Sequence, residues 1–505
     1  SLDLDDPVLG GRRVEMMDVN HLLMQSVVAP IIASPIVLLL GKRLKRDAGW
    51  ITLAPLAYSL ICLAASGYAV YRVGDPLTAS YLWAQPLGAL ILLLDGISAP
   101  VAITIAVLGL LACTYSVSYM EAEGGHGGYF ALYLLFISGM LGAVLSVNLA
   151  AFFIFFELML IASWLLIAFW GEEKREQAAL KYFIYTEAGA LLLLAGIGVA
   201  YAATGTLNLL EIKVRAAGLS SGLISLMVSL MLIGFLVKMA IFPLHSWLPD
   251  AYTQSPTPIT AIFSAMTGIG GYAAIRILYT GFPSMLRSWG FMMTLAVLAL
   301  VTILYGGYMA FAQDRLKTLL AYSSMSQMGY LLFGIASQSI MGLLGAILIY
   351  VAHGFAKAIL FMASGLLSKS AGSDRIRDLS GLAGRMRLMS IAFMIGFLSL
   401  MGFPPLLGFW GELLIFAGSI YSALSSSLDA VRLTVTLIVI IAAMITAGYG
   451  LWTIRRILFG EQSDLVRRSK PEPLLLLAPM LASALLLIIF GIQPTILTKL
   501  AEALA

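Results

Sequence analysis

Four ionisable residues, Glu157, Lys238, Lys357 and Glu412, each stand alone in an apolar stretch long enough to cross a lipid bilayer. A charged side chain at the centre of a bilayer costs about 2.5–3.5 kcal/mol on insertion scales, so exposing all four to lipid would cost roughly 10–14 kcal/mol. That sum is comparable to the stability of a whole domain. The spacing therefore predicts that these side chains face one another, water or polar groups inside a helical bundle, where they can exchange protons or cations.

The segment MLIGFLVKMAIFPLHSWLPDAYTQSPTP, residues 231–258, contains the first of these cations. Lys238 is followed by Pro243, and an interruption of the helix at membrane depth is tolerated only where protein or water replaces the lost hydrogen bonds. His245 lies just beyond this break and is a candidate proton relay. Two simpler interpretations stay open: Lys238 extends its amine to the membrane surface, and His245 is an ordinary interfacial histidine.

A second group of candidates lies in the last third of the chain. His353 and Lys357 are four residues apart in HGFAK and therefore share one helix face. A neutral imidazole beside an amine that can lose its proton suits proton transfer, whereas hydrogen bonding between helices is the structural alternative. Glu412 follows GFPPLLGFWG, in which Pro404 and Pro405 predict another broken helix. A structural role for Glu412 also stays open.

Two carboxylates, Glu157 and Glu187, lie inside apolar segments in the first half of the chain. Glu157 is in the middle of AFFIFFELMLIASWLLI, where its carboxylate reaches neither membrane surface. It either takes part in ion transfer or bonds to a neighbouring helix. Glu187 lies six residues after Lys181, near the end of its segment, so we expect a local ion pair there rather than an ion carrier.

The composition predicts the scaffold that positions these residues. Of 505 residues, 60% are hydrophobic and only 11% are charged, which excludes a soluble globular protein. Recurring apolar runs predict an all-α, polytopic membrane protein of about fourteen transmembrane helices, some of them broken. Cys62 and Cys113 are too few to hold an iron–sulfur cluster, and the sequence has no Walker or Rossmann motif. We therefore expect no catalytic site in this chain and no nucleic-acid partner.

Basic residues predict the orientation in the membrane. Most of the 30 Lys and Arg residues fall in alternate loops between the predicted helices, such as 41–47 and 368–387. Cytoplasmic loops carry such an excess in membrane proteins. The pattern therefore predicts that the N-terminus and the C-terminus both lie outside the cell.

The chain divides into five predicted parts: an acidic N-terminal tail (1–21), helices 1–3 (22–123), a first five-helix repeat with helices 4–8 (124–287), a second five-helix repeat with helices 9–13 (288–460), and a C-terminal loop with helix 14 (461–505). The fourth helix of each repeat is broken by proline and carries a lone charge, Lys238 or Glu412. Because five is odd, the two repeats run in opposite directions through the membrane. Inverted repeats with interrupted helices are typical of secondary transporters.

The chain resembles the antiporter-like membrane subunits shared by respiratory complex I, the Mrp cation/proton antiporters and the membrane-bound hydrogenase and sulfur reductase complexes. The segments that carry the resemblance are LSVNLAAFFIFFELMLIASWLLI, FLVKMAIFPLHSWLPDAYTQSPTPITAIFSA, DRLKTLLAYSSMSQMGYLLFGI, LIYVAHGFAKAILFMASG and GFPPLLGFWGE. A glutamate at position 412 is similar to the Mrp D subunit and the M-type chain of complex I, whereas other branches have lysine there.

The resemblance implies roles for the candidate residues. Glu157 and Lys238 would form the charge pair of a first half-channel. His353 and Lys357 would lie along a central polar axis, with Glu412 as its terminal charged residue. These roles come from the family and not from the spacing of the residues in this sequence.

One position departs from the family pattern. The eighth helix of the family usually carries a central lysine or histidine, whereas this sequence has Gly268 within AMTGIGGYAAIR. Either ordered water with Thr267 and Tyr272 fills the gap, or this subunit conducts differently.

We therefore expect a proton- or sodium-translocating subunit of a redox-driven membrane complex in the plasma membrane of a prokaryote. A change in the field from a neighbouring subunit would weaken the Glu157–Lys238 pair, and the proton of Lys238 would move along water and Lys357 toward Glu412. The resemblance implies several partners: further antiporter-like subunits, small Mrp-like subunits and a redox arm that holds any iron–sulfur, NiFe or flavin cofactor.

Two alternatives remain. The first is an Mrp-type sodium/proton antiporter subunit without a redox partner. The second is a structural membrane subunit that has lost conduction, which the glycine at position 268 motivates.

Overall fold

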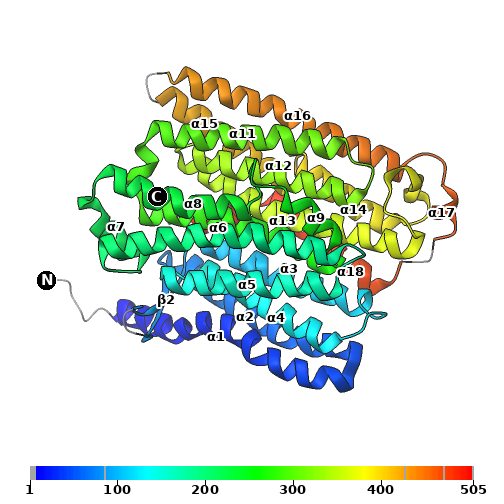
Figure 1. The fold of residues 1–505 in the computed structure, drawn as a ribbon, viewed down its shortest axis with the longest axis horizontal. Coiled ribbons are helices and arrows are strands. Elements are labelled where there is room, and N and C mark those ends of the chain that lie inside the picture. Colours follow the sequence, from blue (N-terminus) through cyan, green and yellow to red (C-terminus); the bar gives the residue numbers. More distant parts are fainter. Residues whose placement is uncertain (1–6, 85–86, 426–427, 470–471, 503–505) are drawn as a thin grey trace.

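The protein is a bundle of long helices that run nearly side by side (Figure 1). The computed structural model describes residues 7–84, 87–425, 428–469 and 472–502, with side chains described between Asn20 and Lys499. Twelve helical segments among these residues are long and apolar enough to cross a bilayer. The prediction of a mostly helical, polytopic membrane protein is therefore confirmed.

The helices of the first part of the chain are α1 (Pro7–Leu44), η1 (Lys45–Asp47), α2 (Ala48–Val73), α3 (Ser98–Tyr119), α4 (His126–Leu145), α5 (Leu149–Trp170), α6 (Arg175–Thr204), α7 (Leu209–Arg215), η2 (Ala216–Gly218), α8 (Ser221–Lys238), α9 (Trp247–Gln254), α10 (Thr257–Ile275), η3 (Arg276–Gly281) and η4 (Pro283–Arg287).

The helices of the second part are α11 (Trp289–Phe311), α12 (Leu316–Ala336), α13 (Ile340–Ala371), η5 (Ile376–Asp378), η6 (Leu382–Gly384), α14 (Arg387–Leu400), α15 (Leu407–Ser425), α16 (Ala430–Leu458), α17 (Asp464–Arg467), α18 (Leu474–Ile492) and α19 (Thr495–Glu502). α1 and α2 lie at one edge of the bundle and α16 at the opposite edge (Figure 1).

The twelve apolar segments differ from the predicted fourteen for physical reasons. α1 and α2 follow each other through η1 and form one helical run, Asn20–Val73. α12 is outside the twelve, and serine, glutamine and lysine make it more polar than its neighbours. α14 has only 14 residues and is not counted, but α15, which follows the break at Pro404 and Pro405, represents the predicted broken helix among the twelve.

A short hairpin precedes α3 and was not predicted. β1 (Leu77–Tyr81) pairs antiparallel with β2 (Leu90–Leu94), with Leu77 opposite Leu94 and Tyr81 opposite Leu90. The sequence predicted only helices between residues 22 and 123, but this hairpin lies in that region and α3 begins at Ser98. A short apolar run such as LILLL fits a strand or a helix equally well, so periodicity alone could not separate the two.

α10 is the most enclosed of the long helices, and most residues of α12 and α13 are buried as well. Every residue of α10 is buried, as is the central run of α13 from Gly345 to Leu367. Glycines let the surrounding helices approach closely: a Cβ on Gly189 of α6 would lie 2.9 Å from Val237 of α8, and one on Gly345 of α13 would lie 2.8 Å from the Gly411 carbonyl of α15. Small residues at helix contacts are the usual means of close packing in membranes.

The helical path is interrupted at two places, between α8 and α9 and between α14 and α15. α8 ends at Lys238 and α9 begins at Trp247, with Pro243 between them. α14 ends at Leu400 and α15 begins at Leu407, and Pro404 and Pro405 lie in that gap. Each interruption therefore leaves helix-end backbone groups that neighbouring groups have to satisfy. Trp247 supplies one partner, because its Nε1–H donates to the Val237 carbonyl at 2.9 Å.

The predicted acidic tail, residues 1–21, is only partly described. Residues 1–6 lie outside the described residues, and the backbone is helical from Pro7 onward as the start of α1. The polar composition of this segment predicted a tail, because hydropathy marks where the apolar part of a helix begins and not where the helix itself begins.

Candidate functional site

Lys238 lies at the C-terminal end of α8 and is buried. Its Nζ donates a hydrogen bond to the Tyr182 hydroxyl of α6 at 3.1 Å. The same nitrogen lies over the rings of Phe156 and Tyr182, 5.4 and 5.3 Å from their centroids. The Tyr182 hydroxyl is also 2.8 Å from Ser163 Oγ of α5. The direct contacts of this cation are therefore aromatic faces and a hydroxyl. A lysine with a purely structural role would usually contact a carboxylate.

Glu157 of α5 is half-buried and interacts electrostatically with Lys238. The two residues form no ion pair within 4.0 Å in the described part of the chain, and Tyr182 interacts with both of them. One carboxylate oxygen of Glu157, Oε1, has no hydrogen-bond partner among the described residues. The structure thus brings Glu157 and Lys238 into one cluster, with Tyr182 as an intermediate that the sequence did not suggest.

The predicted ion pair between Glu187 and Lys181 is wrong. Lys181 instead binds Asp250 of α9, with Nζ 2.7 Å from Oδ2. Glu187 of α6 lies next to Glu157 and interacts with it. Residues six apart lie on different sides of a helix, so Lys181 and Glu187 point toward different neighbours.

His245 lies in the interruption between α8 and α9. Its ring stacks on Phe242, with centroids 5.5 Å apart, and meets the edge of Tyr305 at 4.8 Å. Its Nδ1 has no hydrogen-bond partner among the described residues. His245 interacts electrostatically with Lys181, so it lies between the Lys181–Asp250 ion pair and the broken helix.

His353 and Lys357 form a second cluster on α13, and both are buried. Lys357 Nζ donates to the Leu320 carbonyl of α12 at 2.8 Å, and no ion pair of Lys357 occurs in the region that the structure describes. Neither ring nitrogen of His353 has a hydrogen-bond partner there. A buried polar atom without a partner is uncommon and costly in a folded protein. The structure confirms that these two residues share a face but provides no carboxylate to neutralise the lysine.

Glu412 is buried one turn into α15, beside the second interruption. Its carboxylate lies directly against Gly402, which has a φ of 64° and no room for a Cβ. The hydroxyls of Tyr330 and Tyr449 are close enough to interact with it electrostatically. Glycine at position 402 therefore serves two purposes, since it allows the left-handed backbone and leaves space for the carboxylate.

Sequence reasoning missed a buried ion pair between Asp95 and Arg276. Arg276 Nη1 donates to Asp95 Oδ2 at 2.6 Å, Arg276 Nη2 donates to Oδ1 at 2.5 Å, and Nε donates to the Tyr272 hydroxyl at 2.8 Å. The Ile97 and Ser98 amides also donate to Asp95 Oδ1. Burial would raise the pKa of the Asp95 carboxyl, but the Arg276 guanidinium and these donors hold it below its ordinary value. The pair was missed because both residues lie next to predicted loops.

A polar junction joins both parts of the chain at the bundle end that holds loop 171–174. Lys317 of α12 is buried, and its Nζ donates to Glu172 Oε1 and to the Ser255 carbonyl, both at 2.7 Å. Arg315 pairs with Asp374 nearby at 3.1 Å. A hollow of about 600 Å³ lies beside these residues. The sequence did not identify Lys317 as a candidate residue.

The described residues contain no group of three or more His, Cys, Asp or Glu side chains that could hold a metal ion. The site instead consists of single charged side chains that lie deep in a helical bundle, beside hydroxyl and carbonyl groups. Fold and site together define an antiporter-like membrane subunit. The chain belongs to the NADH:quinone oxidoreductase/Mrp antiporter family, whose profile matches residues 146–446.

Known proteins similar to this chain come from several membrane complexes. It is 32% identical to the F(420)H(2) dehydrogenase subunit M of Methanosarcina mazei over 410 residues, which cover 80% of each chain. Its fold is similar to a chain of the Mrp complex from Dietzia, with a TM-score of 0.85, 25% identity and 96% of each chain covered. It is also similar to a chain of an archaeal membrane-bound sulfane sulfur reductase, with a TM-score of 0.83, 26% identity and coverage of 96% and 97%.

Proposed function

We propose that the chain is a proton- or sodium-translocating subunit of a redox-driven membrane complex. The observation that supports this most strongly is Lys357, which is buried on the central helix α13 with a backbone carbonyl as its hydrogen-bond partner. A cation in such a position is expensive, so an intramembrane lysine of this kind indicates an ion pathway. Lys238 and Glu412 are buried in the same way beside the two helix interruptions.

The proposed path begins at the Glu157–Lys238–Tyr182 cluster and ends at Glu412. Glu157 helps to keep Lys238 charged, and a field change in a neighbouring subunit weakens this interaction so that Lys238 releases its proton inward. Coulomb energies between such groups reach several kcal/mol at intermediate dielectric, enough to drive the transfer. His353 and Lys357 receive the proton. His245 relays protons to Lys238.

We propose the membrane topology that the sequence predicts. Fourteen helices cross the membrane when each interrupted pair counts as one crossing, and residues 129–279 and 289–454 form inverted repeats. The division of the chain at residues 21, 123, 287 and 460 follows from this, as do external termini in a prokaryotic plasma membrane.

Partner subunits supply the chemistry that drives transport. A relative of this chain is a subunit of an F(420)H(2) dehydrogenase, and a structurally similar chain belongs to a sulfane sulfur reductase. In our proposal any iron–sulfur, NiFe or flavin cofactor resides in a redox arm, and this chain contributes none. Its other partners are antiporter-like and small Mrp-like membrane subunits.

The central test uses Lys238→Ala and Glu157→Gln in the assembled complex, with ion uptake into vesicles as the measurement. Both variants should lose uptake, because the first removes the carried charge and the second removes the charge that stabilises it. Lys213→Ala and Glu176→Gln change exposed residues and serve as matched controls with normal uptake. Unchanged uptake in both test variants would remove these residues from the path.

Tyr182→Phe tests the hydroxyl that lies between the two charges. The variant loses the hydrogen bond to Lys238, and a hydrogen bond to a charged group is worth about 1.5–3 kcal/mol. The uptake rate should therefore fall roughly tenfold to a hundredfold. Tyr185→Phe on the exposed side of the same helix is the control. Equal rates in both variants would mean that the Tyr182 hydroxyl has no part in transfer.

The second candidate is an Mrp-type sodium/proton antiporter subunit without a redox partner, and the similarity to the Dietzia Mrp chain favours it. Purification of the native complex separates the two candidates, because iron–sulfur or NiFe proteins among the companions support the redox complex. Small membrane subunits alone support the antiporter. Loss of transport in Lys238→Ala would exclude the remaining alternative of a purely structural subunit.

A further inference from the structure

α10 lies between the two charge clusters, and opposite faces of this helix contact them. On the first face, a Cβ on Gly270 would lie 2.8 Å from Met239 Cγ and 3.4 Å from Lys238 Cβ. Met266, one turn earlier on the same face, accepts a hydrogen bond from the Tyr182 hydroxyl at 3.5 Å. This face of α10 therefore borders the Lys238 cluster.

The second face of α10 contacts α13 and α12. Ser264 Oγ donates to the Gly354 carbonyl of α13 at 3.1 Å, next to His353. Gly268, one turn later, packs against Tyr350 of α13. α10 therefore separates Lys238 from the His353–Lys357 cluster, and Gly268 lies on the face of α10 that contacts α13.

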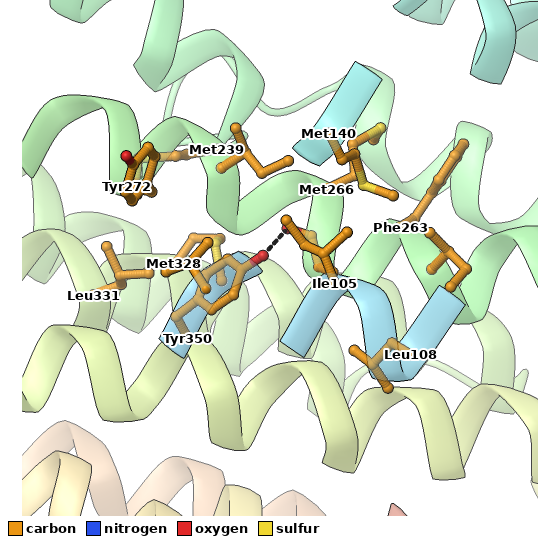
Figure 2. Close-up of a cluster of buried hydrophobic side chains, with 14 of the residues drawn as sticks. Ile105, Leu108, Met140, Met239, Phe263, Met266, Tyr272, Met328, Leu331 and Tyr350 are labelled. Atoms are coloured by element: carbon orange, nitrogen blue, oxygen red, sulfur yellow. Dashed lines mark hydrogen bonds between the residues drawn. The ribbon is translucent and has the colours of Figure 1, made fainter. Parts of the chain in front are cut away.

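Tyr350 fills the space at Gly268. A Cβ on Gly268 would overlap the Tyr350 ring, and the three nearest atoms all belong to that ring. The Tyr350 hydroxyl donates to the Ala265 carbonyl at 3.1 Å, as the dashed line in Figure 2 shows. The hydroxyls of Thr267 and Tyr272 bond to Tyr252 and to the Val144 carbonyl.

Buried apolar side chains gather around the Tyr350 ring. Figure 2 shows this cluster, whose labelled members are all buried and include Ile105, Met140, Met239, Met266, Met328 and Leu331. Protons cross a layer of hydrocarbon and thioether groups only along polar groups or water, so this cluster favours a barrier beside the ring. Methionine is unbranched and adaptable, so the same neighbours can accommodate a second position of the ring.

We propose that Tyr350 is a gate between the two half-channels of this subunit. With its ring on Gly268, the gate is closed and the Lys238 cluster is separated from His353 and Lys357. When the ring leaves Gly268, the glycine surface is bare and water joins the two clusters across α10. Tyr350, His353 and Lys357 follow one another on the same face of α13, so the gate lies directly beside the receiving group. The inference rests on the translocation function proposed above.

The test compares Tyr350→Ala, Tyr350→Phe and Gly268→Ala in the native complex, reconstituted into vesicles. A pH-sensitive dye reports the passive proton leak without electron donor and the driven uptake with donor. Tyr350→Ala removes the ring and should raise the leak severalfold and collapse the driven gradient. Gly268→Ala displaces the ring and should raise the leak less. Tyr350→Phe keeps the ring and should behave like the parent in both assays.

Phe355→Ala is the matched control, because it creates a similar space on α13 where the side chain faces Phe490. A leak in Tyr350→Ala no larger than in Phe355→Ala overturns the gate. If Tyr350→Ala does not assemble, an unchanged leak in Gly268→Ala overturns it instead. Tyr350→Phe also tests the gate, because it keeps the ring and removes only the hydroxyl. If this variant leaks protons, or if it loses driven uptake without a leak, the hydroxyl and not the ring controls transfer. Either result overturns the gate.

Lys238→Ala in the same vesicles separates failure of the gate from failure of the proposed function. If Lys238→Ala abolishes uptake and Tyr350→Ala does not leak, the subunit translocates ions and only the gate is wrong. If Lys238→Ala leaves uptake normal, the proposed function is wrong and the gate falls with it.

Discussion

Lys357→Met is expected to abolish ion uptake while leaving the protein at least as stable as the parent. Lys357 is buried, and its amine binds the Leu320 carbonyl with no ion pair in the described structure. Methionine has a similar length but no charge to desolvate. Replacing even a buried ion pair with apolar side chains of similar volume is often neutral or stabilises a protein by about 1–4 kcal/mol, and Lys357 has no ion-pair attraction to lose. A functional lysine should thus show opposite effects on transport and stability.

Uptake by vesicles and thermal unfolding in detergent measure the two effects. Lys317→Met is the contrast, since Lys317 is equally buried but pairs with Glu172 and the Ser255 carbonyl. That variant should lose stability and keep most of its uptake. A fall in stability for Lys357→Met, together with normal uptake, would make Lys357 a structural residue and remove the main support for translocation.

Asp95→Ala is expected to destabilise the protein by about 3–5 kcal/mol, the usual cost of leaving one partner of a buried ion pair alone. Arg276 would remain buried with only the Tyr272 hydroxyl as a side-chain partner. The pair connects the turn before α3 with the end of α10, so the loss should loosen the contact between these helices. Thermal unfolding in detergent measures this loss of stability, and Asp75→Ala, which changes an exposed residue, is the control.

The pH dependence follows the same ion pair. The pKa of Asp95 is lower in the folded protein than its ordinary value. Its contribution to stability is therefore complete above about pH 4 and is lost as the pH falls through the folded pKa. The double variant Asp95→Ala/Arg276→Met should recover part of the stability. Equal unfolding temperatures for Asp95→Ala and Asp75→Ala would show that the ion pair contributes little.

Hydropathy predicted most of the fold, because a bilayer requires long apolar helices wherever the chain crosses it. It failed where length and polarity are ambiguous. The run LILLL became β2 because it pairs with residues 77–81, a contact outside any local window. α8 was predicted to continue to Pro243 but ends at Lys238, five residues earlier. Proline marks the region of a break, whereas packing against neighbours determines the residue at which the helix ends.

The sequence found the lone charges of the site but not their partners. Insertion costs indicate that Lys238 and Lys357 are enclosed, and both are buried. Their hydrogen-bond partners, Tyr182 and the Leu320 carbonyl, lie 56 and 37 residues away and depend on tertiary packing. Single-sequence reasoning also favoured the near neighbour Glu187 for Lys181, although the actual partner is Asp250. The spacing of charges in the sequence identifies the charged residues of a site, but it does not identify partners that lie far away in the sequence.

The complete enclosure of α10 constrains how the bundle assembles. All of its residues are buried, and its neighbours include α3 and α8, which precede it, and α12 and α13, which follow it. A helix inserted in chain order would still have one side open to lipid until α13 arrives, some 65 residues after α10 ends. The innermost helix thus reaches its final surroundings late in synthesis, and the bundle closes around it rather than growing outward from it.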